Sequence, residues 1–222
     1  MISVRGQKES DMVESERIKV WDIAVRVFHW SLVLLFFVAY FSGDEESLLH
    51  VYSGYGVMGL VAFRVVWGFV GTKHARFADF LYGRKATVGY VRSLLKLKPV
   101  HYLGHNPLGG WMVFALLVSI AGSCWSGLEA YGAHGQGPLA ESRSWGVSSA
   151  MAYDEAEHDS GTESGSGRSS GSRFWHEIHE ALSNFTLFLV FLHVVGALFA
   201  SATHRENLVK AMVTGFKTRH AP

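Results

Sequence analysis

Four long apolar stretches constrain this chain more than any other feature of its sequence. They run roughly from Ile23 to Ser42, Leu48 to Val70, Pro107 to Leu128 and His179 to Ala202. A helix needs about 20 apolar residues to cross the hydrocarbon core of a bilayer. Backbone polar groups in lipid must be satisfied within the spanning element, which favours helices. The sequence therefore predicts an all-α integral membrane protein, built as a four-helix transmembrane bundle in the lipid bilayer.

The composition agrees with a membrane environment. Of 222 residues, 49% are hydrophobic and only 18% are charged, which is too few charges for an ordinary soluble domain of this size. We expect no nucleic acid partner. Residues 1–19 are polar and lack the apolar region and small-residue cleavage site of a signal peptide, so the first span is expected to act as the membrane signal.

Charged residues separate into a basic side and an acidic side. The loop from Thr72 to Gly104 and the C-terminal tail are basic, whereas residues 129–173 are acidic and end in a Gly/Ser-rich segment. Basic loops face the cytoplasm in bacterial inner membranes. This predicts a multi-pass protein with cytoplasmic tails at 1–22 and 203–222, a four-span domain at 23–202, and an outward-facing, partly disordered loop at 129–173.

Four histidines lie within or at the ends of the spans, where polar groups are costly and need a reason. His179 and His193 are 14 residues apart, so they share one face of a helix and lie about 21 Å apart along its axis. With antiparallel spans, His179 should lie at the depth of His50, and His193 at the depth of His29. This layout predicts two opposed imidazole pairs, one near each membrane surface.

Paired imidazoles are the usual axial ligands of haems that transfer electrons. The single cysteine, Cys124, excludes the C-x-x-C-H attachment of a c-type haem, so any haem would be held without covalent bonds. We therefore expect two bis-histidine haems b, with His29, His50, His179 and His193 as the iron ligands.

Other polar residues leave alternatives open. His176 competes with His179, but it lies about 100° off the face that carries His193. Arg26 and Arg64 could each pair with a haem propionate or extend toward the lipid headgroups. We expect the remaining histidines to be solvated or without an assigned role, and these are His74, His101, His105, His134, His158, His204 and His220.

Small residues on the second span could make room for a macrocycle. Gly54, Gly56 and Gly59 follow His50 and leave little side chain on that half of the span. Their spacing is not the G-x-x-x-G pattern of a helix dimer. We expect them to let a flat ring approach the backbone beside His50.

Several short motifs, in a fixed order, resemble the prokaryotic cytochrome b561 family, which includes the b-type cytochrome subunits of nickel-iron hydrogenases. The resemblance extends over nearly all of the four spans. The motifs are Val20-Trp21-Asp22, Arg26-Val27-Phe28-His29-Trp30, Leu49-His50 with Gly54, Phe63-Arg64-Val65-Val66-Trp67-Gly68-Phe69, Gly104-His105-Asn106-Pro107, Ile178-His179-Glu180 and Leu192-His193.

The resemblance implies two haems b on the four histidines named above. It also implies electron transfer between quinone and a partner redox protein, such as a c-type cytochrome or a hydrogenase or dehydrogenase complex. We expect a quinone near the cytoplasmic haem between spans one and four. The acidic outer loop would meet a basic partner. The rival reading is a metal-ion or proton transporter that uses the intramembrane histidines, and a third is a structural anchor.

Overall fold

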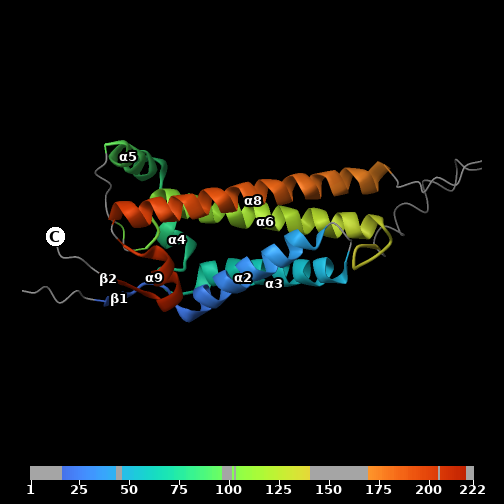
Figure 1. The fold of residues 1–222 in the computed structure, drawn as a ribbon, viewed down its shortest axis with the longest axis horizontal. Helices are drawn as coiled ribbons and strands as arrows, with labels where there is room; N and C mark the ends of the chain where they lie inside the picture. The colour runs from blue at the N-terminus through green and yellow to red at the C-terminus, as the bar shows by residue number, and fades with distance from the viewer. Residues whose placement is uncertain are drawn as a thin grey trace, which may run out of the picture. The chain divides into compact units, whose positions relative to one another are not determined.

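The computed structural model describes residues 17–43, 47–96, 102, 104–140, 170–204 and 206–218. Four long helices dominate it: α2 (Ile23–Phe41), α3 (Leu48–Val70), α6 (Pro107–Ala133) and α8 (Ser170–His204) (Figure 1). Shorter elements are the strands β1 (Arg17–Lys19) and β2 (Phe216–Thr218), and the helices α4 (Phe77–Phe80), α5 (Arg84–Leu95) and α9 (Leu208–Thr214).

The four long helices are the expected membrane spans. Each is long and apolar enough to cross a bilayer. They also carry many large apolar side chains on their outer surfaces; on α8, Phe185, Phe188 and Phe191 are 51%, 54% and 63% exposed. Exposed rings of this kind are stable against lipid tails but not against water. The predicted four-helix membrane protein is confirmed.

Two of these helices extend beyond their apolar cores. α6 continues to Ala133, and α8 begins at Ser170, so residues 129–133 and 170–173, expected in the outer loop, are helical. α8 has 35 residues and is therefore about 52 Å long, against a hydrocarbon core of about 30 Å. A hydropathy pattern identifies only the apolar part of such a helix, which lies in the lipid, and not its polar end. Residues 141–169 of the expected loop lie outside the described residues.

Polar caps fix where two of the spans begin. The Asn106 side chain accepts a hydrogen bond from the Gly109 amide at 2.7 Å, directly before Pro107, which confirms the expected start of α6. Asp22 does the same for α2, accepting from the Val25 amide at 2.7 Å. The other Asp22 carboxylate oxygen accepts from the Trp67 indole at 3.3 Å and from the Thr72 hydroxyl.

The chain divides into two compact units, and each long helix contributes to both. Unit 1 comprises Met1–Val33, Ala62–Phe114 and Phe191–Pro222, and unit 2 comprises Leu34–Val61 and Ala115–Val190. His29, His193 and both arginines belong to unit 1. His50 and His179 belong to unit 2.

Unit 1 contains a small sheet that hydropathy did not predict. β1 and β2 pair antiparallel, with Ile18 opposite Lys217. Between α9 and β2, Gly215 has φ +86°, and its carbonyl accepts from the amides of Val20 and Trp21 at 2.9 and 3.1 Å. A side chain at Gly215 would be strained and would meet the Trp21 carbonyl at 2.8 Å. The N-terminal segment is therefore joined to the segment that follows α9.

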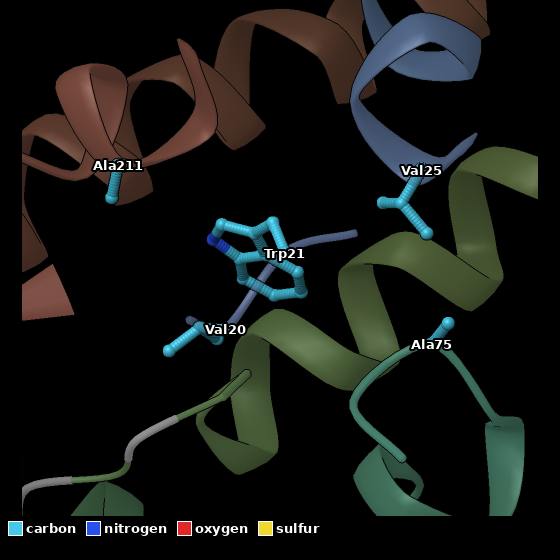
Figure 2. Packing of buried hydrophobic residues seen from close by; sticks show 5 residues of the cluster. All are labelled: Val20, Trp21, Val25, Ala75 and Ala211. Atoms are coloured by element: carbon cyan, nitrogen blue, oxygen red, sulfur yellow. The ribbon is translucent and has the colours of Figure 1, made fainter. Parts of the chain in front are cut away.

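The apolar core of unit 1 forms around this junction. Trp21 lies at the centre of the cluster, and the other labelled side chains surround it (Figure 2). They come from the segment before α2, the start of α2, the turn after α3 and helix α9, and are Val20, Val25, Ala75 and Ala211. This cluster therefore packs together segments of unit 1 that are far apart in the sequence.

Unit 2 is held by close contacts between small and hydroxyl-bearing residues. The Thr186 hydroxyl on α8 is fully buried and lies 2.7 Å from the Ser119 hydroxyl on α6. A methyl group on Gly56 of α3 would come within 2.8 Å of Leu35 on α2. Small residues of this kind let membrane helices approach closely.

Candidate functional site

Unit 2 brings His50 of α3 and His179 of α8 together. Their ring centroids are 5.8 Å apart, with an interplanar angle of 82°. The expected partner at the level of His50 is therefore His179. The competing residue, His176, is exposed to solvent on the same helix.

Backbone carbonyls fix the tautomer of both rings. His50 Nδ1 donates to the Ala39 carbonyl on α2 at 2.8 Å, and His179 Nδ1 donates to the Ser123 carbonyl on α6 at 2.9 Å. A carbonyl oxygen can only accept, so Nδ1 carries the proton in each neutral ring and Nε2 keeps its lone pair. Metal-ligating histidines are typically held in this way, with the other ring nitrogen bound to a carbonyl.

Glycines beside this pair leave room for a flat group. Gly54 lies one turn after His50, and a Cβ placed on it would meet nothing within 4 Å. On α6, a Cβ on Gly127 would come within 3.0 Å of the His179 ring, so the α6 backbone lies directly against that imidazole. Gly56 differs from the expectation, because it packs against Leu35 and does not border open space.

Unit 1 holds the second pair, His29 on α2 and His193 on α8. The two imidazoles are near enough to interact electrostatically, and both are half-buried. His29 Nδ1 is buried and has no hydrogen-bond partner within the described part of the chain. This pair therefore lacks the carbonyl contact that orients both rings of the other pair.

Arg26 and Arg64, the two arginines expected near the haems, both contact protein groups. Arg64 is only 3% exposed; its Nη2 donates to the Ala75 carbonyl at 3.0 Å, and its guanidinium lies 5.1 Å from the centre of the Phe77 ring. Arg64 therefore does not extend to the headgroups. Arg26 donates to the carbonyl of Val213. Across the residues that the structure describes, Arg64 Nη1 and Arg26 Nε are buried without a partner.

The expectation that His105 is solvated is wrong. Its ring contacts Trp21 and Phe80, with centroid distances of 4.7 and 4.9 Å. Burial, reinforced by the positive charge of Arg64, lowers the pKa of His105 to about 3, so the ring is neutral at physiological pH. One feature of the sequence could have indicated this burial. His105 directly precedes Asn106 and Pro107, the capped start of α6, so it lies where that helix begins.

The remaining histidines assemble no further site. His74 is half-buried and His134 is exposed, whereas His101, His158 and His220 lie outside the described residues. In the described ranges, no group of three or more His, Cys, Asp or Glu side chains lies close enough to hold a metal ion. The two imidazole pairs therefore remain the candidate iron ligands among the described residues.

The donor set of these pairs suits haem b. His50 and His179 present unprotonated Nε2 atoms from two helices, and Gly54 leaves open space one turn from His50. Imidazole is a common axial ligand of haem iron.

A comparison with known families identifies the chain. Residues 20–215 match the family described as prokaryotic cytochrome b561. The chain belongs to this family. Prokaryotic cytochromes b561 are b-type cytochromes, so the family implies a membrane protein that transfers electrons through haem b.

Three curated relatives carry the name "Probable Ni/Fe-hydrogenase B-type cytochrome subunit". The chain is 29% identical to the protein of Rhizobium leguminosarum bv. viciae over 47% of its own length and 55% of that protein, so it spans about half of this relative. It is 23% identical to that of Cupriavidus necator, over 96% of the chain and 93% of the relative. It is 25% identical to that of Rhodobacter capsulatus, over 90% of the chain and 80% of the relative. No solved structure matches the chain.

Proposed function

We propose that this cytochrome b561 carries two haems b and transfers electrons between the quinone pool and a partner redox protein. Family membership and the four spans support membrane electron transfer. The two imidazole pairs, each in its own unit, support the number of haems.

In this proposal His50 and His179 hold one haem, and His29 and His193 hold the other. Haem supplies a one-electron couple, and the chain sets the environment of that couple. The backbone carbonyls of Ala39 and Ser123 orient the first pair of rings and keep Nε2 available. The observation that carries the proposal is this double Nδ1–carbonyl contact, because it prepares two facing imidazoles as ligands.

Absorption spectroscopy of the purified protein tests the proposal. We expect low-spin b-type bands and two haems per chain by pyridine haemochrome assay. Substituting either ligand of a pair, as in His179→Ala or His193→Ala, should remove about one haem and leave the other. His134→Ala, which changes an exposed histidine, is the matched control and should keep both.

Two outcomes contradict the proposal. Full haem content in all four ligand variants would exclude this ligand set. A purified protein that holds no haem, but moves Zn²⁺ or protons in vesicles and loses that activity on His193→Ala, would establish the transporter alternative.

The partner we propose is a hydrogenase, because the three relatives are named as hydrogenase cytochrome subunits. A c-type cytochrome or a dehydrogenase complex fits the same chemistry. The acidic residues expected to meet a basic partner lie mostly in 141–169, outside the described residues. Neutralising them should weaken partner binding at low salt and remove its salt dependence. Unchanged binding at every salt concentration would refute a role for this loop.

A quinone site is proposed near the His29–His193 haem, between the first and fourth spans. The long apolar helices give a lipid-soluble quinone direct access to that region from the bilayer. Quinol oxidation by the purified protein, with haem reduction followed optically, tests this. His193→Ala should abolish it, and failure with every quinone tested would refute it.

We propose that both chain ends are cytoplasmic and that the protein lies in a bacterial inner membrane. Pairing of β1 with β2 supports a common side for both ends. At either chain end, a fused reporter that works only in the cytoplasm should be active, and one that works only in the periplasm should be inactive. A reporter inserted within 141–169 should show the opposite pattern. Opposite signals from the two ends would overturn this topology.

A further inference from the structure

Four buried side-chain nitrogens lack a hydrogen-bond partner among the described residues, and all four belong to unit 1. An unsatisfied buried donor costs about 1–3 kcal/mol, so folded proteins nearly always pair such groups. A polar group bound in unit 1 would account for their gathering there. The four atoms are Arg26 Nε, His29 Nδ1, Arg64 Nη1 and His105 Nδ1.

Arg64 and His105 both pack on Phe80, which is 2% exposed. The guanidinium lies 5.7 Å from the centre of that ring, and the His105 ring lies 4.9 Å from it. Arg64 Nη2 is already bound to the Ala75 carbonyl, which leaves Nη1 free to donate elsewhere. The two unpaired nitrogens therefore lie beside one aromatic ring.

The electrostatic surroundings of His105 favour an anion. The charged and titratable groups that act on its ring are Arg64, His193, Lys217 and His74, and none of these is acidic. Arg64 interacts with the carboxylate of Asp22, but that group already accepts from Val25, Trp67 and Thr72. A buried guanidinium with an unpaired Nη1, next to an imidazole nitrogen that can carry a proton, is suited to a carboxylate.

We propose that Arg64 Nη1 and His105 Nδ1 bind one and the same carboxylate, a propionate of the haem held by His29 and His193. This inference rests on the proposed function. His193 is one of the groups that act electrostatically on His105, and Arg64, His105, His29 and His193 all belong to unit 1. A neutral quinone carbonyl could accept the same hydrogen bonds, but it would bring no negative charge to the buried Arg64, whose acidic neighbour Asp22 already accepts from three other donors.

Midpoint potentials in quinone-free detergent test the inference. Loss of either donor leaves more negative charge on the carboxylate, which favours ferric iron, so Arg64→Gln and His105→Phe should each lower the potential of one haem component and leave the other unchanged. If both donors serve one carboxylate, the double variant should shift less than the sum of the two single shifts. Arg76→Gln and His134→Phe make the same replacements at exposed positions and should shift neither component.

Exchange of the native haem for its dimethyl ester separates propionate from quinone. In the ester-loaded protein the carboxylate is absent, so His105→Phe should no longer differ from the parent, and the shift of Arg64→Gln should shrink to the direct effect of the lost charge. A His105→Phe shift that persists with the ester, additive shifts, or unchanged potentials together with altered quinol oxidation would each overturn the inference.

Conservative variants guard against a folding defect. If Arg64→Gln or His105→Phe loses haem altogether, Arg64→Lys and His105→Gln keep a donor and should keep haem with smaller shifts. A higher potential of the shifted component in these variants, with haem content intact, would count against the inference. A wild-type protein without haem would refute the proposed function itself, whereas haem content without any shift refutes only this assignment.

Discussion

At the residue scale, the two imidazole pairs differ in what orients them. His50 and His179 are held through Nδ1 by carbonyls from two further helices, whereas His29 Nδ1 has no partner among the described residues. Hydrogen bonding of this kind fixes ring orientation and raises the basicity of the ligand nitrogen. Orientation of the unit 2 pair therefore depends on α2 and α6 as well as on the helices that carry the rings.

Gly127→Val should remove the unit 2 haem selectively. The first added carbon would already lie 3.0 Å from His179 Cε1, and the two γ-methyl groups would displace the ring from the Ser123 carbonyl. We expect haem content to fall by about half in a haemochrome assay, with the His29–His193 bands kept. Gly122→Ala, where the added carbon meets Leu182 at an ordinary 3.5 Å, should keep both haems. Full haem content in Gly127→Val would contradict this account.

Asp22→Ala should destabilise the start of α2 by about 0.5–2 kcal/mol, the usual cost of losing an N-cap. Burial opposes ionisation of Asp22, but hydrogen bonds from Thr72, Val25 and Trp67 outweigh it, so the pKa of the carboxyl lies below its ordinary value of 3.8. The stabilisation is therefore complete above pH 3.8 and is lost as the pH falls through the lowered pKa.

Thermal unfolding in detergent across pH measures this. The difference between wild type and Asp22→Ala should be constant near neutral pH and shrink only in strong acid. Asp79→Ala, at an exposed acid in α4, serves as the control and should cost less. A stability difference between wild type and Asp22→Ala that grows as the pH falls would contradict the lowered pKa of Asp22.

The sequence could predict residues whose role depends on helix periodicity, but not residues whose role depends on contacts between distant segments. The spacing of His179 and His193 placed them on one face, and the structure brings His50 to His179. His105 was misjudged because its burial is caused by Trp21 and Phe80, which come from other parts of the chain. The ligand roles themselves stay predictions.

At the element scale, the contacts between spans in unit 2 are small and polar. Thr186 Oγ1 donates to the Leu182 carbonyl of its own helix at 2.8 Å and accepts from Ser119 of α6. Lipid tails are as apolar as the helices, so close packing and hydrogen bonds provide the driving force for association. The membrane spans were predictable from hydropathy, whereas the polar start of α8 and the three-residue strands carry no apolar signal long enough to detect.

Thr186→Val tests this contact between α6 and α8. The change keeps the shape but removes the shared hydroxyl, and interhelical hydrogen bonds in membranes contribute about 0.6 kcal/mol on average. We expect a fall of that size in the free energy of unfolding, measured in mixed micelles. Thr203→Val is the matched control, because among the described residues the Thr203 hydroxyl bonds only the Phe199 carbonyl of its own helix. Equal effects of both variants would exclude a specific role for the interhelical contact.

At the scale of the whole molecule, the two units give the two proposed haem sites different electrostatic surroundings. Unit 1 holds the buried Arg64 and the partly buried Arg26, whose positive charges favour ferrous haem. Unit 2 offers carbonyl-bound imidazoles, which favour the ferric form. Under the proposed ligation, we therefore expect the unit 2 haem to have the lower midpoint potential of the two.

A redox titration should therefore resolve two components, the lower from the His50–His179 haem. His179→Ala should remove the lower component and His193→Ala the higher one. Arg64→Gln should narrow the gap between the two by lowering the higher component. Loss of the higher component in His179→Ala would reverse the assignment.

The antiparallel pair β1–β2 joins residues that are synthesised at very different times. The ribosome adds about 5–20 residues per second, so Arg17 waits roughly 10–40 seconds before Phe216 is synthesised. Helix α8 supplies one imidazole to each pair, so under the proposed ligation neither haem has both of its ligands until this last span has entered the bilayer. We therefore expect haem insertion to follow the synthesis of α8, and the strand pair to be among the last contacts to form.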